Sequence, residues 1–339
     1  MNNVFIYCEQ NENGKVADVS LELLSKGRKI AAQLDVKLEA VLLGHNLSEA
    51  VEQLSWYGIH KIHCLDDARM FPYRSLPHAK VITTLFKQET PEIAIFGASS
   101  VGRDLAPRVA SALKCGLTAD CTSLEIGDHH IEKEGITYKD LLYQIRPAFG
   151  GNIIATIINP ETRPQMATVR EGVMKLEPLT EKNSPEISKI TSTLLTDAEE
   201  LVQIIDRHIE ASKVDLKGAQ IIVSGGYGMQ NRDNFNKLFE LAALLGGEVG
   251  ATRAAVDGGF CDHERQIGQT GVTVRPKLYI ACGISGSVQH TAGMDQAAKI
   301  ISINTDPNAP INAIADYTIE GEIMTVLPKL ITYYKKHSK

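Results

Sequence analysis

Residues 278–290 read Leu278-Tyr279-Ile280-Ala281-Cys282-Gly283-Ile284-Ser285-Gly286-Ser287-Val288-Gln289-His290, and this stretch decides the fold of the second half of the chain. The mainly apolar run Lys277–Cys282 predicts a buried strand, and the small residues after it predict a loop leading into a helix near Val288. Such a loop lets the backbone approach a ligand closely. Its serines and the first N–H groups of the helix can hold an anion. His290 would lie one turn into the helix, either as a structural residue or as a ligand contact.

A second loop in this half reads Ser224-Gly225-Gly226-Tyr227-Gly228. It follows a predicted strand, Gln220–Val223, and precedes a predicted helix, Asn234–Leu245. The loop does not complete the pattern G-x-G-x-x-G, because Gly228 is not followed by a third glycine at the required spacing. It therefore either brings backbone N–H groups to a phosphate or makes a tight turn that needs positive φ.

A third loop begins at Thr252 and Arg253, directly after the predicted strand Glu248–Ala251, and Ile267-Gly268-Gln269-Thr270-Gly271 follows it. The carboxyl ends of parallel strands face the ligand crevice in sheets of this kind. Arg253 is therefore either a cation placed against a cofactor ring or a surface arginine that is solvated or salt-bridged.

The first half also alternates short apolar runs with amphipathic stretches. The predicted strands are Val4–Tyr7, Leu38–Leu43, Lys61–Cys64 and Ile93–Phe96, and the predicted helices are Val19–Leu34, Leu47–Trp56, Ala79–Phe86 and Arg103–Leu113. Both halves thus predict an α/β protein of two domains, 1–205 and 206–339, each a mostly parallel doubly wound sheet. Residues from about 178 to 217 are rich in charge and lack periodicity, so they are interpreted as the connection.

The pattern changes from Ala119 onward, where strands are joined by turns rather than helices. The predicted strands there are Cys121–Ile126, Leu141–Ile145, Asn152–Ile158 and Gln165–Val169. They predict β-hairpin additions to the first sheet.

The amino-acid composition and charge of the chain argue against several classes of function. The chain has 339 residues, more than one core usually holds, and 35 basic against 41 acidic residues give a formal charge of −6. This balance argues against nucleic acid as a partner. No apolar run reaches the ~20 residues of a membrane span. The start, Met1–Tyr7, resembles a strand rather than a targeting signal, so the expected compartment is cytoplasmic.

Motifs for catalysis and metal binding are missing from the sequence. The six cysteines form no C-x-x-C pair, so neither an Fe–S cluster nor a structural zinc site is expected. The chain has no H-E-x-x-H, P-loop, EF-hand or G-x-S-x-G pattern. We therefore assign no catalytic residue and no metal ligand.

The loops belong to a longer series of sequence blocks. In the second half these are 224–226, 252–257, 266–271, 276–281, 283–286, 289–290, 292–294, 303–304, Asp306, 309–311 and 315–317. In the first half they are 102–108, 116–121, Arg146–Asn152 and Arg163–Arg170. In this order and spacing the blocks resemble the alpha subunits of electron transfer flavoproteins over nearly the whole chain.

The resemblance implies that the second domain is an FAD-binding fold and that the first domain packs on a beta subunit. The flavin-ring arginine of the family falls on Arg253, its N5 hydroxyl donor on Thr270 and its ring-O2 histidine on His290. The full set of implied FAD contacts is Thr252, Arg253, Ile267, Gly268, Gln269, Thr270, Ser285, Gly286, Ser287, Val288, Gln289, His290, Asn304, Tyr227 and Glu322.

Within this set the segment Ser285–Gln289 would hold the pyrophosphate and ribityl region, and Asn304 the adenosine side. Two positions depart from the family pattern, because Tyr227 replaces an arginine and Glu322 replaces an aspartate. Both belong to the outer contacts of the cofactor. The contacts to the flavin ring match the family.

The chemistry of these residues suits one-electron transfer. A flavin that accepts one electron gains negative charge along N1 and O2, so a nearby cation and donors at O2 and N5 favour that reduction. For a one-electron couple, about 59 mV corresponds to a tenfold change in equilibrium.

The resemblance implies a redox carrier subunit of a heterodimer, shuttling single electrons between dehydrogenases, rather than a stand-alone enzyme. The blocks Arg146–Asn152 and Arg163–Arg170 look most like those of anaerobic bacterial members that bifurcate electrons. Such a complex would carry a second FAD in the beta subunit, reduced by NADH. Its partners would be an acyl-CoA or other flavin dehydrogenase, and ferredoxin or flavodoxin for the low-potential electron. The alternative is a plain carrier with AMP in the beta subunit.

Two other classes of protein are alternatives to an electron transfer flavoprotein subunit. A nicotinamide-dependent Rossmann dehydrogenase would need the complete G-x-G-x-x-G that the second loop lacks. A non-redox nucleotide-binding module would explain the first domain. It would not explain why Arg253, Thr270 and His290 occur together in the second.

Overall fold

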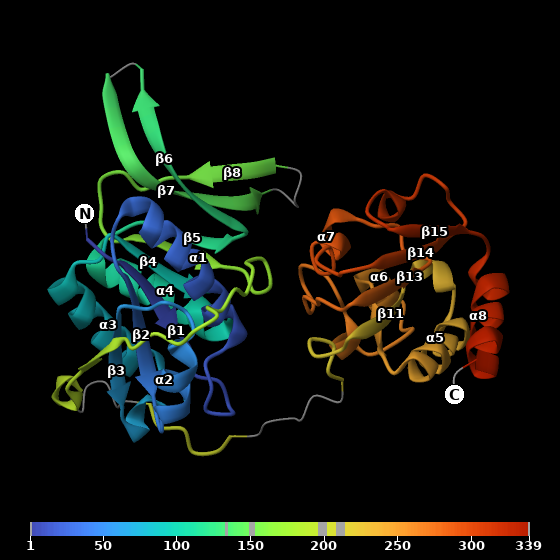
Figure 1. Cartoon of the computed structure of the whole chain (residues 1–339), viewed down its shortest axis with the longest axis horizontal. Coiled ribbons are helices and arrows are strands. Elements are labelled where there is room, and N and C mark those ends of the chain that lie inside the picture. Colours follow the sequence, from blue (N-terminus) through green and yellow to red (C-terminus); the bar gives the residue numbers. More distant parts are fainter. Residues whose placement is uncertain (1, 133–134, 149–152, 196–201, 208–213, 338–339) are drawn as a thin grey trace. The chain divides into compact units, whose positions relative to one another are not determined.

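The computed structural model describes residues 2–132, 135–148, 153–195, 202–207 and 214–337. The chain separates into two compact units, 1–207 and 208–339, each with its own sheet and core (Figure 1). Within the described ranges, no helix is both long and apolar enough to cross a membrane.

The first unit is built on a seven-stranded sheet whose neighbouring strands are all parallel. In spatial order the strands are β10 (Glu186–Lys189), β3 (Lys61–Asp66), β2 (Leu38–Gly44), β1 (Val4–Cys8), β4 (Ile93–Gly97), β9 (Gln165–Val169) and β5 (Leu117–Cys121). Helices α1 (Asp18–Leu34) and α2 (Ser48–Leu54) cover one face, and α3 (Ser75–Glu89) and α4 (Ser100–Leu113) cover the other (Figure 1). The predicted doubly wound α/β sheet is confirmed.

Strand β1 shows why this sheet is buried on both faces. Val4, Ile6 and Cys8 join the core under α1 and α2, whereas Phe5 and Tyr7 join the core under α3 and α4. Successive side chains of a strand point to opposite faces, so an apolar residue at every position requires cover on both.

The region after Ala119 differs in two respects from the prediction of β-hairpin additions to the first sheet. Strands β6 (Ser123–Ile131), β7 (Ile136–Ala148) and β8 (Ile153–Ile157) form a separate three-stranded antiparallel sheet. Gln165–Val169 does not extend this hairpin region, because as β9 it lies fully buried between β4 and β5 of the parallel sheet. Residues 149–152, which end the Arg146–Asn152 block and include the first residue of the predicted strand Asn152–Ile158, lie outside the described ranges.

The connection also contains a strand that the sequence analysis missed. Glu186–Lys189 forms β10 and pairs in parallel with β3. The segment is short and mostly exposed, so its sequence carries no apolar pattern, and backbone pairing to the sheet edge accounts for its conformation.

The second unit has a five-stranded parallel sheet. In spatial order its strands are β12 (Glu248–Ala251), β11 (Ile221–Gly225), β13 (Leu278–Cys282), β14 (Ile300–Asn304) and β15 (Tyr317–Glu320). Helices α5 (Arg232–Leu245) and α8 (Ile323–His337) cover one face of this sheet (Figure 1). Loops and the short helices α6 (Arg253–Asp257) and α7 (Val288–Thr291) make up much of the remaining chain of this unit. This confirms the second α/β sheet.

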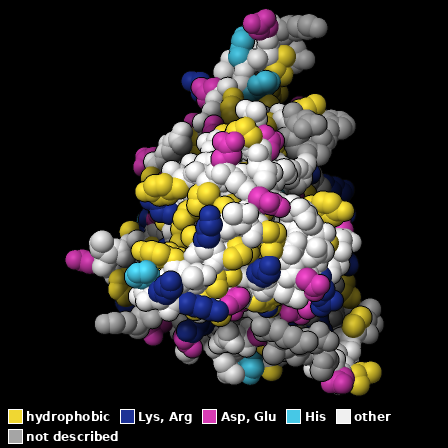
Figure 2. Space-filling model, turned by 90° about the vertical axis from the view of Figure 1, so that its right-hand side faces the viewer, with side chains coloured by type: hydrophobic (Ala, Val, Ile, Leu, Met, Phe, Trp, Pro, Cys, Tyr) yellow, Lys and Arg dark blue, Asp and Glu magenta, His cyan; other side chains and the backbone are white. Residues whose placement is uncertain are grey.

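Short 3-10 helices complete the described elements: η1 (Ala68–Met70), η3 (Ser192–Leu194), η5 (Tyr227–Met229), η6 (His263–Arg265) and η7 (Pro310–Ala313). On the face drawn in Figure 2, basic and acidic side chains are interspersed with hydrophobic ones. Exposed ion pairs of the second unit include Lys335–Glu240 and Lys299–Asp316.

The strand order of the second unit fixes where a ligand can bind. From β11 the chain moves to β12 on one side and then crosses to β13 on the other, so the order reverses between β11 and β13. A crevice opens at the carboxyl ends of the strands at such a switch point.

Candidate functional site

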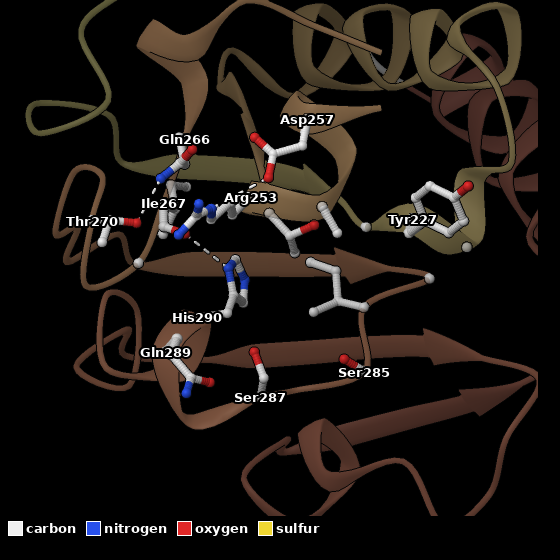
Figure 3. Close-up of a pocket in the computed structure, with 17 residues that line it drawn as sticks. Tyr227, Arg253, Asp257, Gln266, Ile267, Thr270, Ser285, Ser287, Gln289 and His290 are labelled. Atoms are coloured by element: carbon white, nitrogen blue, oxygen red, sulfur yellow. Dashed lines mark hydrogen bonds and ion pairs between the residues drawn. The ribbon is translucent and has the colours of Figure 1, made fainter. Parts of the chain in front are cut away.

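A cavity of about 460 Å³ lies at the carboxyl ends of β11, β12 and β13 (Figure 3). Of the residues assigned from sequence, it is lined by Tyr227, Thr252, Arg253, Ile267, Gly268, Thr270, Ser285, Ser287, Gln289 and His290. A second cavity of about 240 Å³ shares Gly228, Gly283 and Ser285 with the first and includes Asn304 and Glu322. Three assigned residues, Gln269, Gly286 and Val288, do not line either cavity.

Arg253 is placed by the start of helix α6. Thr252 precedes the helix, and its hydroxyl accepts a hydrogen bond from the backbone N–H of Ala255 at 3.4 Å. Arg253 Nε lies 3.3 Å from Asp257 Oδ2, one turn further along the helix, and both side chains are largely exposed at 70% and 64%. Arg253 is thus both salt-bridged and a lining residue. Asp257 was not predicted as the partner of Arg253, although the spacing i, i+4 is a recognisable sign of such a pair.

Thr270 is held by a residue that the sequence analysis did not assign. Gln266 is buried, and its side-chain N–H donates to Thr270 Oγ1 at 2.9 Å (Figure 3). Because the threonine oxygen accepts this bond, its own hydrogen remains able to donate into the cavity. The neighbouring Gly268 has φ 141°, and a Cβ there would stand 2.7 Å from the carbonyl oxygen of Gln289. This close approach brings the two loops together.

His290 is buried in the cavity wall, and protein groups engage both of its ring nitrogens. Nδ1 lies 3.0 Å from the backbone oxygen of Ile267, and Nε2 lies 2.9 Å from the hydroxyl oxygen of Tyr279. Burial lowers the pKa of His290 to about 4, which the bond to the Ile267 carbonyl partly opposes. The imidazole is therefore neutral at neutral pH.

The loop between β13 and α7 depends on glycine. Gly283 and Gly286 have φ values of 61° and 88°. A Cβ on Gly286 would stand 2.2 Å from the backbone nitrogen of Ile311, which donates to the Ser285 carbonyl at 3.1 Å. The hydroxyl of Ser287 makes no capping bond to α7, although Ser287 precedes that helix and lines the cavity.

At the second cavity, Asn304 organises the surrounding backbone. Its amide N–H donates to the Ile284 carbonyl at 2.9 Å, and its side-chain oxygen accepts from the Asp306 N–H at 3.0 Å. Tyr227 lies at the other end of the first cavity and stacks on Phe260 with ring centroids 5.6 Å apart. The residue is 64% exposed.

The lining fits a cofactor with a flat polar ring and a long tail. Around the larger cavity stand a guanidinium, a hydroxyl held by an amide and a neutral imidazole, which suit a ring that carries carbonyl and nitrogen atoms. The smaller cavity continues from Ser285 to Asn304 and Glu322. The two together provide an elongated site for a dinucleotide such as FAD.

Comparisons with known proteins agree with this chemistry. Residues 4–195 match the electron transfer flavoprotein domain, and residues 215–295 match the electron transfer flavoprotein FAD-binding domain. The chain is 44% identical to an electron transfer flavoprotein subunit alpha of Thermoanaerobacterium thermosaccharolyticum, over 98% of both chains. It is 44% identical to the subunit of that name in Clostridium acetobutylicum, over 98% of this chain and 96% of the relative. It is also 39% identical to an acryloyl-CoA reductase electron transfer subunit beta of Anaerotignum propionicum, with the same coverage.

Proposed function

This chain belongs to the electron transfer flavoprotein alpha-subunit family and binds FAD, and from this premise we propose that it carries single electrons between dehydrogenases through the cavity at the carboxyl ends of β11, β12 and β13. The observation that carries the proposal is the convergence of Arg253, Thr270 and His290 on that cavity. When bound, the flavin supplies the one-electron chemistry that no protein side chain here provides.

Each of these side chains has a distinct part in the proposal. Arg253 supplies positive charge that favours an electron entering the cavity, and Asp257 offsets part of it. Thr270 donates a hydrogen bond from a hydroxyl that Gln266 holds in place. His290 closes the cavity wall as a neutral ring. Ser285, Ser287 and Gln289 line the route toward the second cavity, where Asn304 and Glu322 would hold the adenosine end.

The test is cofactor content in two fragments cut within the connection. We expect a fragment from about residue 206 onward to retain visible flavin absorbance with one FAD per chain. A fragment ending at about residue 205 should have none. Flavin bound only to the first fragment would contradict the assignment of the site and of the domain boundary.

A beta subunit is the proposed partner of the first unit. Strand β8 pairs with β7 along one side, and its side chains Ile153 and Ile154 are 52% and 73% exposed. Exposed apolar residues on the last strand of a small sheet form a surface that a partner chain can cover. We expect a one-to-one heterodimer by light scattering. A monodisperse alpha chain, stable alone at micromolar concentration, would contradict this.

We further propose that the complex of this chain with its beta subunit bifurcates electrons. A relative named for acryloyl-CoA reductase supports an acyl-CoA oxidoreductase as partner. The proposal adds a ferredoxin or flavodoxin as the second acceptor. This reading requires two FAD molecules per heterodimer and reduction by NADH. One FAD with one AMP, and no reduction by NADH, would favour the alternative of a plain carrier.

A further inference from the structure

Behind the cavity wall, side chains of β11, β13 and α7 lie in a row. Tyr279 on β13 is completely buried, and its hydroxyl oxygen lies 2.9 Å from His290 Nε2. Ser224 on β11 is also completely buried. Tyr279 is paired in register with Ile222, two residues before Ser224, so the serine and the phenol share one face of the sheet.

The direction of the hydrogen bonds in this row follows from the chemistry of the groups. The carbonyl of Ile267 can only accept, so Nδ1 of His290 carries the hydrogen. In the neutral ring Nε2 then has a lone pair, and the phenol of Tyr279 must donate to it. In the resting state, therefore, the Tyr279 hydroxyl donates a hydrogen bond to His290 Nε2, and His290 Nδ1 donates one to the Ile267 carbonyl.

Ser224 is the unusual member of the row. Its hydroxyl oxygen is buried and has no hydrogen-bond partner among the described residues. Burial raises the pKa of Tyr279, and the Ser224 side chain, placed to hydrogen-bond to the phenol, opposes that rise. Ser224 therefore lies beside the phenol, although its oxygen makes no hydrogen bond of ordinary length to a described residue. Buried hydroxyls are normally satisfied, which makes an unused acceptor beside a phenol a feature that calls for a role.

We propose that Ser224 and Tyr279 form a reversible hydrogen-bond relay that allows His290 to accept a proton when negative charge enters the cavity. The proton comes from solvent and binds Nε2, which then donates to the phenol oxygen of Tyr279. The phenol hydrogen turns to the unused oxygen of Ser224. No covalent bond of Tyr279 or Ser224 breaks, and one positive charge is gained at His290. This inference rests on the proposed function, since it concerns the same cavity.

The surrounding charges permit this change. A unit negative charge about 4 Å away, at an effective dielectric constant of about 20, favours protonation of a base roughly a thousandfold. Arg253 on α6 opposes it, and Asp257 on the same helix reduces that opposition. Among the described residues, the remaining groups that bear on the cavity or the row are neutral: the side chains of Thr270, Gln266, Tyr279 and Ser224, the Ile267 carbonyl, and the thiol of Cys282, whose pKa burial raises to about 12.

The first experiment does not depend on flavin. Nitrogen NMR of the full-length chain labelled with ¹⁵N-histidine, with the His290 signal assigned by His290→Gln, reports which ring nitrogen carries hydrogen. We expect hydrogen on Nδ1. Tyr279→Phe should shift the Nε2 resonance to that of an unbonded nitrogen and leave the tautomer unchanged. Hydrogen on Nε2 in the wild type, or an Nε2 signal that ignores Tyr279→Phe, would overturn the relay.

The second experiment measures how the first one-electron potential of the bound flavin depends on pH in the purified complex. Uptake of one proton per electron changes the equilibrium tenfold per pH unit, which is about 59 mV. We expect the wild type to approach this slope between about pH 5 and 6.5, which lies between the pKa of about 4 before the electron enters and the roughly thousandfold stronger basicity after it. Ser224→Ala should lose at least half of the slope. Ser302→Ala is the matched control, because Ser302 is a buried serine on β14 that donates to Asn312 at 2.7 Å.

The two measurements separate failure of the relay from failure of the proposed function. A chain without flavin would leave the NMR result standing. A Ser224→Ala slope equal to that of the wild type, or an equal loss of slope in Ser302→Ala, would refute the relay itself.

Discussion

Replacing Arg253 with Ala removes the cation that lines the proposed flavin cavity. A unit charge about 5 Å from an added electron, at an effective dielectric constant of about 40, contributes about 1.7 kcal/mol. We choose this high dielectric because the arginine side chain is 70% exposed. For one electron the energy corresponds to about 70 mV. Asp257, 3.3 Å from the guanidinium, cancels part of the charge, so we expect the first potential to fall by about 40–70 mV.

The assay is spectroelectrochemical titration of the purified complex at fixed ionic strength. Asp257→Asn should move the potential in the opposite direction, and Arg253→Lys should keep most of the wild-type value because the charge remains. Lys335→Ala is the control, since it removes one exposed positive charge from α8, which is one of the two helices that cover a face of the second unit's sheet. A fall in Lys335→Ala as large as in Arg253→Ala, or an unchanged potential in Arg253→Ala with FAD bound, would refute the argument.

Three further predictions test the fold and the site. Gly286→Ala should abolish flavin binding, because φ is 88° and the new Cβ would meet a backbone nitrogen at 2.2 Å; Gly246→Ala, with φ 67° but open space, should cost only about 1 kcal/mol and retain flavin. Leu327→Ala in the core of the second unit should lower the free energy of unfolding by about 2–5 kcal/mol in urea, while Lys329→Ala on the same helix should change it by less than about 0.5. Burial lowers the pKa of His78 to about 4, so the unfolded chain binds a proton that the folded chain does not; stability should decline by up to about 3 kcal/mol as pH falls from about 6.5 to 4, and His78→Gln should flatten that decline in denaturant titrations.

Continuous apolar runs made much of the fold predictable. The runs Val4–Tyr7, Ile93–Phe96 and Lys277–Cys282 correspond to β1, β4 and β13, which are among the strands buried on both faces. For such strands the burial pattern follows from composition alone. The helix Val19–Leu34 was likewise predictable, because its apolar residues recur at helical spacing.

Pairing partners were harder to predict, because periodicity reports burial and not the neighbouring strand. Gln165–Val169 has the composition of a strand, yet nothing local indicates that it enters the parallel sheet between β4 and β5. In the cavity, too, the contacts between residues distant in sequence could not be predicted. Sequence blocks identified Thr270 and His290, but their partners Gln266 and Tyr279 are brought to them by the folded loops and strands.

The residues that hold Arg253, Thr270 and His290 can affect the first one-electron potential of the bound flavin. Arg253 is held by Asp257, and His290 by Tyr279, so each lining group is positioned by a residue of the same chain. A group held in this way needs less reorganisation when charge appears, which is the condition for strong electrostatic stabilisation. Changing a partner alters the charge or hydrogen-bond state of the group that it holds. Chains that keep Arg253, Thr270 and His290 can therefore differ in potential through positions such as Asp257, Gln266 and Tyr279, and comparing these positions in relatives of known potential is the direct way to examine this.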